Sequence, residues 1–372
     1  MKLTLQLKLL PTADHAAALL DTMRRFNEAA SFAARAGFDA KVFSRPSIQK
    51  LCYRDLRDKF GLSAQMAIRA ISKASEAFSA TGKEVCPAFR PDGAMTYDER
   101  ILSFKDVHRV SILAVGAGRL MVPYVFGEYQ AAHLGRIRGQ VDLVYKGGKF
   151  FLYCTVDFQE EPPVEVADFL GVDLGIVNIA ADSTGETYSG ERVDRNRRRR
   201  ATSRKQYQRR GTKSAKRRLK KMAGRQRRFQ AAENHRISKA IVGKAKALGF
   251  GIALEDLSGI RGRIEKTVGR AFRRRFGNWG FFQLRSFVEY KAKRAGVPVM
   301  PVDPRNSSRT CNVCGHCEKA NRPNQATFRC KHCGHSTNAD LNAALNLASR
   351  ARASRNQALQ VSTSCQGQSP RL

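Results

Sequence analysis

The sequence contains no apolar run of the eighteen or so residues that a membrane-spanning helix needs, and its N-terminus lacks the apolar core of a signal peptide. It is also poor in acids, because 32 Asp and Glu oppose 67 Lys and Arg and leave a formal net charge of +35. The first two absences predict a soluble intracellular protein. No lipidation signal or amphipathic anchor favours a membrane surface, so we expect nucleic acid to be the polyanion that neutralises this charge.

Cysteine is scarce outside one short stretch, since five of the nine cysteines lie in residues 311–333. This distribution does not suit a disulfide framework and indicates metal binding in a reducing compartment. Two C-x-x-C pairs, separated by fifteen residues, offer the four thiolates that a structural zinc ion takes tetrahedrally. The predicted ligands are Cys311, Cys314, Cys330 and Cys333. Ordinary buried or disulfide-bonded cysteines are the alternative, and Cys317 leaves the choice of ligands open.

The first 163 residues combine strand patterns with helical ones, and 372 residues suffice for two to four domains. Residues 2–9 alternate apolar and polar side chains, as a half-buried strand does. Residues 140–156 contain two apolar runs around a Gly-Gly pair, the pattern of a β-hairpin. We therefore predict a small barrel or sandwich formed by residues 1–10 and 81–163, interrupted by a helical insertion over residues 11–80.

From residue 169 the pattern changes to short, continuously apolar strands that end in acids. Phe169–Asp173 ends in a glycine-flanked aspartate, and a second run, residues 250–257, contains Glu255 and Asp256. Strands this apolar belong to the interior of a sheet, where the ends of neighbouring strands can converge. We predict an α/β domain with a cysteine module inserted into it and a polar tail after it. The boundaries are residues 164–302 and 336–355 for the domain, 303–335 for the module and 356–372 for the tail.

A long basic run follows the first of these strands. Between Arg195 and Arg228 the chain has eighteen Lys and Arg and no Asp or Glu. Few apolar residues interrupt it, so we expect helical segments with little core of their own. A solvated charged surface is the alternative, but such a run would repel itself, and we predict phosphate contacts that position nucleic acid without reading its bases. The predicted contact residues are Arg197, Arg198, Arg199, Arg200, Arg204, Lys205, Arg209, Arg210, Lys216, Arg217, Arg218, Lys220 and Lys221. A second basic segment, residues 261–276, is predicted to be a loop with the same role.

Three acids share a setting: Asp173 and Glu255 end apolar strands, and Asp340 opens a helix. Taken singly, each could be a helix cap or a surface salt bridge. Taken together, three converging carboxylates are the oxygen ligands that Mg²⁺ prefers. Two such ions, about 3.5–4 Å apart, activate water and stabilise the leaving oxygen in phosphodiester hydrolysis. Asp256 is expected to lie at the strand end rather than among the ligands.

Three sequence motifs resemble the split RuvC motifs and zinc ribbon of TnpB, the insertion-sequence-encoded relatives of type V CRISPR effectors. They are Leu170-Gly-Val-Asp-Leu-Gly, Ile252-Ala-Leu-Glu-Asp-Leu, and the two C-x-x-C pairs followed by Asp340-x-Asn-Ala-Ala-x-Asn. Trp279 and Tyr290-Lys-Ala also match the helix before the ribbon. The resemblance is close over residues 165–350, whereas the N-terminal part agrees only in layout. It implies a multidomain α+β and α/β protein with an N-terminal β-barrel (wedge) and helical recognition insertion, an RNase H-like RuvC nuclease domain and an inserted zinc ribbon.

The resemblance implies an RNA-guided DNA endonuclease of the prokaryotic cytoplasm. Its partners would be a guide RNA from the transposon end and double-stranded target DNA beside a short target-adjacent motif. Asp173, Glu255 and Asp340 would bind two Mg²⁺ ions. The four paired cysteines would hold one structural Zn²⁺. A nuclease-inactive guided repressor is one alternative, disfavoured because all three acids are present. A transposase that joins strands at an RNase H-like site is the other. The oligomeric state is left open.

Overall fold

The structure is a computed structural model that describes residues 2–175, 177–256 and 281–366, with side chains described to residue 357 except that of residue 281. The chain divides into two compact units, Met1–Gln159 and Glu160–Leu372. Each is described by itself. The predicted basic loop over residues 261–276 and the predicted match at Trp279 lie outside the described residues.

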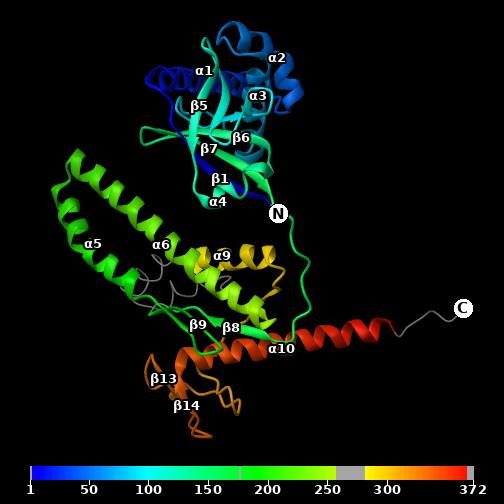
Figure 1. Ribbon diagram of the computed structural model, residues 1–372, viewed down its shortest axis with the longest axis vertical. Coiled ribbons are helices and arrows are strands. Elements are labelled where there is room, and N and C mark those ends of the chain that lie inside the picture. Colours follow the sequence, from blue (N-terminus) through cyan, green and yellow to red (C-terminus); the bar gives the residue numbers. More distant parts are fainter. Residues whose placement is uncertain (1, 176, 257–280, 367–372) are drawn as a thin grey trace, which may run out of the picture. The chain divides into compact units, whose positions relative to one another are not determined.

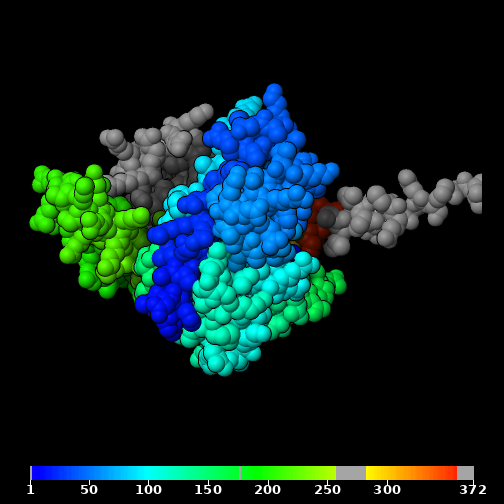
Figure 2. Space-filling model, turned by 90° about the horizontal axis from the view of Figure 1, so that it is seen from above, coloured from blue at the N-terminus to red at the C-terminus, as the bar shows by residue number. Residues whose placement is uncertain are grey.

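Three helices follow the first strand of the N-terminal unit, over the stretch predicted to be helical (Figure 1). Side-chain oxygens cap all three: Thr12, Ser44 and Ser63 each accept a hydrogen bond from the backbone N–H three residues later. Their apolar faces pack in one core with the strands, and in the space-filling view the blue helices and cyan strands form a continuous surface (Figure 2). The helices are α1 (Ala13–Asp39), α2 (Arg45–Asp58) and α3 (Ala64–Thr81).

The strands of the N-terminal unit form one antiparallel sheet in the order β2-β6-β7-β1-β5-β4-β3. Its two edge strands are consecutive in the chain and only a short loop joins them, so the sheet nearly closes on itself. The predicted hairpin is present as β6 and β7, with both turn glycines at positive φ. The strands are β1 (Lys2–Leu9), β2 (Met95–Tyr97), β3 (Leu102–Phe104), β4 (Arg109–Ala114), β5 (Gly118–Val125), β6 (Ile137–Lys146) and β7 (Lys149–Asp157); the short helices α4 (Glu128–Ala131) and η1 (Leu134–Arg136) lie between β5 and β6.

The C-terminal unit is built on a mixed five-stranded sheet with the order β10-β9-β8-β11-β12. The strands β8, β11 and β12 run parallel, while β9 is antiparallel to β8 and β10 is antiparallel to β9. This arrangement places the carboxyl ends of β8 and β11 side by side, as the apolar strand patterns predict. The strands are β8 (Phe169–Asp173), β9 (Asn178–Asp182), β10 (Thr187–Ser189), β11 (Gly251–Glu255) and β12 (Val299–Val302).

Helices cover both faces of this sheet (Figure 1). On one face α6 and α9 pack against alternate strand residues such as Leu170 and Ile252, and on the other α10 packs through Leu347 and Ala351. The helix α5 folds back on α6 as a hairpin. The predicted polar tail begins inside α10, which continues to Gln366. The helices are α5 (Glu191–Arg210), α6 (Lys213–Leu248), α9 (Phe281–Arg294) and α10 (Ala339–Gln366).

The cysteine module precedes α10 and has little regular structure. It holds the short helix η2 (Lys319–Asn321) and the strand β13 (Thr327–Arg329), which pairs with β14 (Ser336–Asn338). Its core is small: Phe328, two cysteines and Ala339. Because so few apolar groups are buried, the module depends on other interactions for its stability.

Gly171 in β8 is the point where α10 approaches the sheet most closely. A Cβ atom at this position would lie 1.9 Å from the Ala344 carbonyl oxygen of α10. We expect Gly171→Ala to destabilise the C-terminal unit by about 3 kcal/mol or more, since the helix must move away from the sheet. Urea unfolding measures the loss. Gly243→Ala in α6 is the matched control: a Cβ there meets nothing within 4 Å, so this variant should be slightly more stable than wild type. Equal stability of the two variants would contradict the close packing.

Candidate active site and metal centre

The carboxylates of Asp173 and Glu255 lie next to each other at the ends of two parallel strands. Asp173 is the last residue of β8 and Glu255 the last residue of β11, and the register pairs Leu254 with Val172 one position earlier. Carboxyl ends of parallel strands meet at one edge of the sheet, so both side chains emerge there. Strand pairing thus joins acids that are 82 positions apart in the sequence.

The third acid reaches the same place from the first turn of α10. Asn338 starts this helix, because its side-chain oxygen accepts hydrogen bonds from the backbone N–H groups of Asp340 (2.9 Å) and Leu341 (3.2 Å). Asp340, Asp173 and Glu255 all line one cavity of about 390 Å³. The sequence predicted this convergence. The cavity wall also includes Leu174, Gly175, Val177, Asn178, Pro304, Arg305, Ser307, Ser308, Arg322 and Gln325.

The close approach of the chain to β9 explains the glycine two positions after Asp173. A Cβ atom on Gly175 would lie 2.7 Å from the carbonyl oxygen of Asn178, so any other residue would push β9 away from β8. The Asp-x-Gly pattern therefore has a steric reason: the chain must fold back at once, beside the cavity.

Two cavity residues contact Asp340 directly, and no sequence pattern pointed to either of them. The side-chain amide of Asn178 in β9 donates to Asp340 Oδ2 at 2.9 Å. The Arg322 guanidinium, from the cysteine module, lies 3.5 Å from Asp340 Oδ1. Asn178 is 162 residues from Asp340 in the sequence, so no local pattern could pair them. Asp256 is not among the cavity residues, and its carboxylate forms an ion pair with Arg285 at 3.2 Å.

Burial makes the ionised forms of the two strand-end acids costly. Burial, together with the charge of Asp340, raises the pKa of Asp173 to about 6. Burial, together with the charge of Asp173, holds the pKa of Glu255 well above its usual range. A divalent cation would reverse this preference, because it stabilises the ionised carboxylates. The donor set, three carboxylates beside a polar cavity, therefore fits a hard cation such as Mg²⁺.

These pKa shifts predict a stability change in magnesium-free buffer. A carboxyl whose pKa is higher in the folded state binds more protons when folded, so stability is highest at low pH and falls as pH rises through about 6. Asp173→Asn removes one of these charges. We expect its Tm in magnesium-free buffer at pH 7.5 to exceed that of wild type by roughly 5 °C, with the difference shrinking towards pH 5. A difference that grows on acidification would contradict the assignment.

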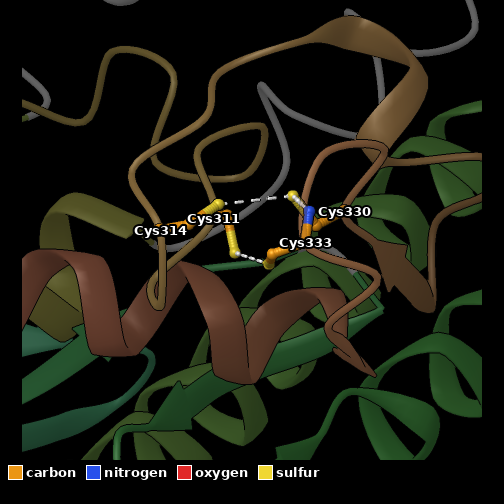
Figure 3. A group of neighbouring side chains, drawn as sticks. All are labelled: Cys311, Cys314, Cys330 and Cys333. Atoms are coloured by element: carbon orange, nitrogen blue, oxygen red, sulfur yellow. Dashed lines mark hydrogen bonds between the residues drawn. The ribbon is translucent and has the colours of Figure 1, made fainter.

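The four paired cysteines form a compact thiol cluster (Figure 3). The sulfur atoms of Cys311 and Cys333 lie 3.7 Å apart, and those of Cys314 and Cys330 lie 3.6 Å apart. Zinc–sulfur bonds of about 2.3 Å in a tetrahedron place sulfurs roughly 3.8 Å apart, so the spacing fits one zinc ion. Across the described residues, this is the one group of three or more Cys, His, Asp or Glu whose ligand atoms all lie within 4.8 Å of one another. The three carboxylates are spread more widely.

Two matching turns present these thiols. In each, the N–H of the first cysteine donates to the carbonyl of the residue five positions later, and a glycine N–H donates back: the partners are His316 and Gly315 in one turn, and His335 and Gly334 in the other. The N–H of Cys333 lowers the pKa of the Cys330 thiol to about 6. The His316 N–H lowers the pKa of the Cys314 thiol, but burial and hydrogen bonds to the other three thiols outweigh this effect and raise the pKa to about 12. A bound metal ion would therefore have to promote ionisation of the full set. Cys317 is exposed and is not in the cluster.

Buried asparagines hold the module together and fix it to α10. Asn321 donates to the carbonyls of Arg309 and His316 and accepts from the Lys331 N–H, so it links the two turns. Asn342 and Asn346, the asparagines of the Asp340-x-Asn-Ala-Ala-x-Asn motif, donate to backbone carbonyls of residues 307 and 310. The same helix therefore carries Asp340 and holds the start of the cysteine module.

The predicted phosphate-contacting residues lie on α5 and the first half of α6, the green hairpin of Figure 1. Ten of the thirteen are exposed, and Arg197, Arg200 and Arg204 are half-buried. Arg197 pairs with Asp194 at 3.0 Å, and Arg200 donates to the Met222 carbonyl at 3.4 Å. The exposed residues thus give the hairpin a strongly positive surface.

Comparisons with known proteins agree with this architecture. Residues 281–347 match the family model of the Cas12f1-like TNB domain, and residues 153–257 match a family described as "Probable transposase", OrfB_IS605. The chain is 32% identical over 260 residues to the CRISPR-associated endodeoxyribonuclease Cas12f1 of Sulfoacidibacillus thermotolerans. The aligned region covers 64% of this chain and 58% of that protein. It is 36% identical over 129 residues to the TnpB-like protein MJ0751 of Methanocaldococcus jannaschii, covering 35% of this chain and 45% of that one. The chain thus spans about half the length of these relatives.

A solved structure has the same fold along nearly the whole chain. One chain of the cryo-EM structure of the Cas12f1–sgRNA–target DNA complex superposes with a TM-score of 0.61 at 12% identity, covering 94% of this chain and 98% of that one. Fold and thiol cluster together define the class: an α+β protein with the fold of Cas12f effectors and a four-cysteine site that fits zinc. The predicted resemblance is confirmed, and the chain is a relative of the TnpB and Cas12f proteins. The described residues contain no helix long and apolar enough to cross a membrane.

Proposed function

We propose that this protein is an RNA-guided DNA endonuclease that hydrolyses phosphodiester bonds with Mg²⁺ at the cavity of Asp173, Glu255 and Asp340. The observation that most strongly supports this function is the convergence of three carboxylates, from segments far apart in the sequence, on one cavity. The parallel strands β8 and β11, which carry two of the acids at their carboxyl ends, support an RNase H-like (RuvC) nuclease domain in the C-terminal unit. The relatives named endodeoxyribonucleases, and the guide-RNA complex with the same fold, add support.

The roles of the residues follow from their positions. Asp173, Glu255 and Asp340 would hold Mg²⁺, which when bound supplies an activated water and charge stabilisation at the phosphate. Arg322, one of two arginines in the cavity wall and the one that contacts Asp340, would stabilise negative charge on the phosphodiester while it also orients Asp340. Glu255 is almost fully buried, which would strengthen the attraction of its carboxylate for cations.

The remaining parts would bind nucleic acid. The positive surface of the α5–α6 hairpin would contact the phosphates of guide RNA and target DNA, and the N-terminal barrel, as a wedge domain, and its helices would recognise the target-adjacent motif. The cysteine module, as a zinc ribbon, would hold nucleic acid over the cavity. Bacterial and archaeal relatives favour a cytoplasmic protein that associates with the nucleoid.

Purification from its host with bound RNA, followed by sequencing of that RNA, tests the proposal. A transposon-end transcript with a variable guide, and cleavage of DNA that matches the guide, would support it. Target binding without any nicking in Mg²⁺ would favour a guided repressor instead. Joined transposon ends formed without guide RNA would favour a transposase.

The hairpin assignment predicts a salt-dependent defect. Replacing Lys216, Arg217 and Arg218 by glutamine removes three exposed charges from α6. We expect weaker RNA binding and a slope of log affinity against log salt that is smaller by about 2, since each lost phosphate contact lowers the slope by roughly 0.7 to 0.9. Filter binding between 100 and 300 mM salt measures both.

The matched control for this variant removes the same charge from α1 and α2 by changing Arg24, Lys50 and Arg57, which are also exposed. Equal losses of RNA affinity in the two triple variants would show that the hairpin is not a preferred binding surface.

A further inference from the structure

Of the three acids, Asp340 has the side chain whose orientation is least fixed by the surrounding backbone. Asp173 and Glu255 end strands that are locked in the sheet, whereas Asp340 lies in the first turn of a helix, where its side chain extends towards the cavity without strand neighbours. A carboxylate binds a cation well only when its oxygens point in a fixed direction. The contacts that fix this direction are therefore part of the site.

Asn178 makes the shortest of the side-chain contacts to Asp340. Its amide nitrogen lies 2.9 Å from Oδ2, while the Arg322 guanidinium lies 3.5 Å from Oδ1. The amide must present its N–H₂ group, since its oxygen would repel the carboxylate. With Oδ2 bonded to Asn178, rotation of the carboxylate is restricted and Oδ1 is directed to the Arg322 side.

The position of Asn178 is itself well determined. It is the first residue of β9, it is paired with Ser189 of β10, and its backbone packs against Gly175 in the turn that follows Asp173. Any shift of Asn178 would therefore also disturb Gly175, two positions after Asp173. Asn178 therefore links the segment after Asp173 to Asp340.

We propose that Asn178 is a positioning residue, which orients Asp340 for divalent-cation binding and acts through it rather than on the substrate. This inference rests on the proposed function, because it assumes that Asp340 binds the cation. Partners that hydrogen-bond a metal ligand typically contribute 10- to 100-fold to metal affinity or activity. Removal of the amide should therefore weaken cation binding and leave the fold and nucleic-acid binding unchanged.

Two variants test the role of the amide. Asn178→Leu fills nearly the same space without a donor, and Asn178→Ala removes both volume and donor. Thr187→Ala, at an exposed position of the neighbouring strand β10, is the matched control. The first readout is Mn²⁺ binding to the full-length, zinc-loaded protein without nucleic acid, followed by electron paramagnetic resonance of free Mn²⁺. The second is the Mg²⁺ dependence of guided DNA cleavage. Tm and target-DNA affinity are measured in parallel.

We expect both Asn178 variants to weaken Mn²⁺ binding about tenfold and to raise the Mg²⁺ concentration for half-maximal cleavage by a similar factor. The rate at saturating Mg²⁺ should recover most of the wild-type value, and Tm and DNA affinity should match those of Thr187→Ala. Wild-type metal dependence in both variants would overturn the inference. So would a rate loss that Mg²⁺ does not restore, or a rescue by leucine, since these indicate a role in packing.

Failure of this inference and failure of the proposed function look different. If wild type has no Mn²⁺ site that Asp340→Ala removes, the proposed function fails at its metal site. If Asp340→Ala removes the site and the Asn178 variants bind Mn²⁺ like wild type, only the role of Asn178 is wrong.

Discussion

Asp173→Asn is expected to lower Mg²⁺-dependent cleavage of guided target DNA by roughly 1,000-fold or more, with guide-RNA affinity unchanged. The substitution keeps the shape of the side chain and removes the anionic ligand, so the loss reports on cation binding rather than on folding. Glu255→Gln and Asp340→Asn should behave in the same way, because all three carboxylates line the same cavity. Single-turnover cleavage of end-labelled DNA measures the rate.

The neighbouring acid supplies the control for this series. Asp256 follows Glu255 directly but pairs with Arg285 and is not part of the cavity wall. Asp256→Asn should therefore keep most of the activity. Cleavage that persists in all three cavity variants, or is lost equally in Asp256→Asn, would overturn the site assignment.

Cys311→Ser is expected to abolish stoichiometric zinc binding and to unfold the cysteine module. The buried core of the module is too small to hold it, and structural zinc typically contributes about 10–16 kcal/mol to such folds. Loss of the module also releases Arg322 from Asp340, so cleavage should fall together with zinc content. Zinc per chain is measured by mass spectrometry, and limited proteolysis reports on the module.

Cys317→Ser is the matched control for zinc, because Cys317 is an exposed thiol in the same module outside the thiol cluster. This variant should bind one zinc per chain and cleave DNA at the wild-type rate. If it loses zinc as Cys311→Ser does, the set of ligands is wrong. Full folding of the module in zinc-free Cys311→Ser would contradict the role of the metal.

Much of the C-terminal unit could be predicted because its signals are local. Apolar strands that end in acids predicted a sheet whose strand ends converge, and β8 and β11 have this arrangement. The C-x-x-C pairs predicted the thiol cluster, since each pair needs only one tight turn. In the N-terminal unit, the Gly-Gly pair predicted the β6–β7 hairpin for the same reason.

What could not be predicted depends on contacts between distant segments. The bonds of Asn178 and Arg322 to Asp340 appear only after β9, the cysteine module and α10 come together, and neither residue has a distinctive local pattern. The extent of α10 was also missed. Its last turns are polar and resemble a tail, yet the helix continues to Gln366. The sequence likewise left open whether Cys317 is a ligand, and only the fold shows that it lies outside the thiol cluster.

The two asparagines on α10 have a consequence for how such proteins can diversify. Asn342 and Asn346 bind the start of the cysteine module, and the end of the module runs directly into the same helix. Both ends of this segment are thus tied to the first two turns of α10. Lengthening or replacing the exposed stretch around Asn324 would leave those ties where they are, but Arg322 and Gln325, on either side of it, line the cavity. Natural selection and protein engineers can therefore vary this stretch only while these two residues keep their places beside Asp340.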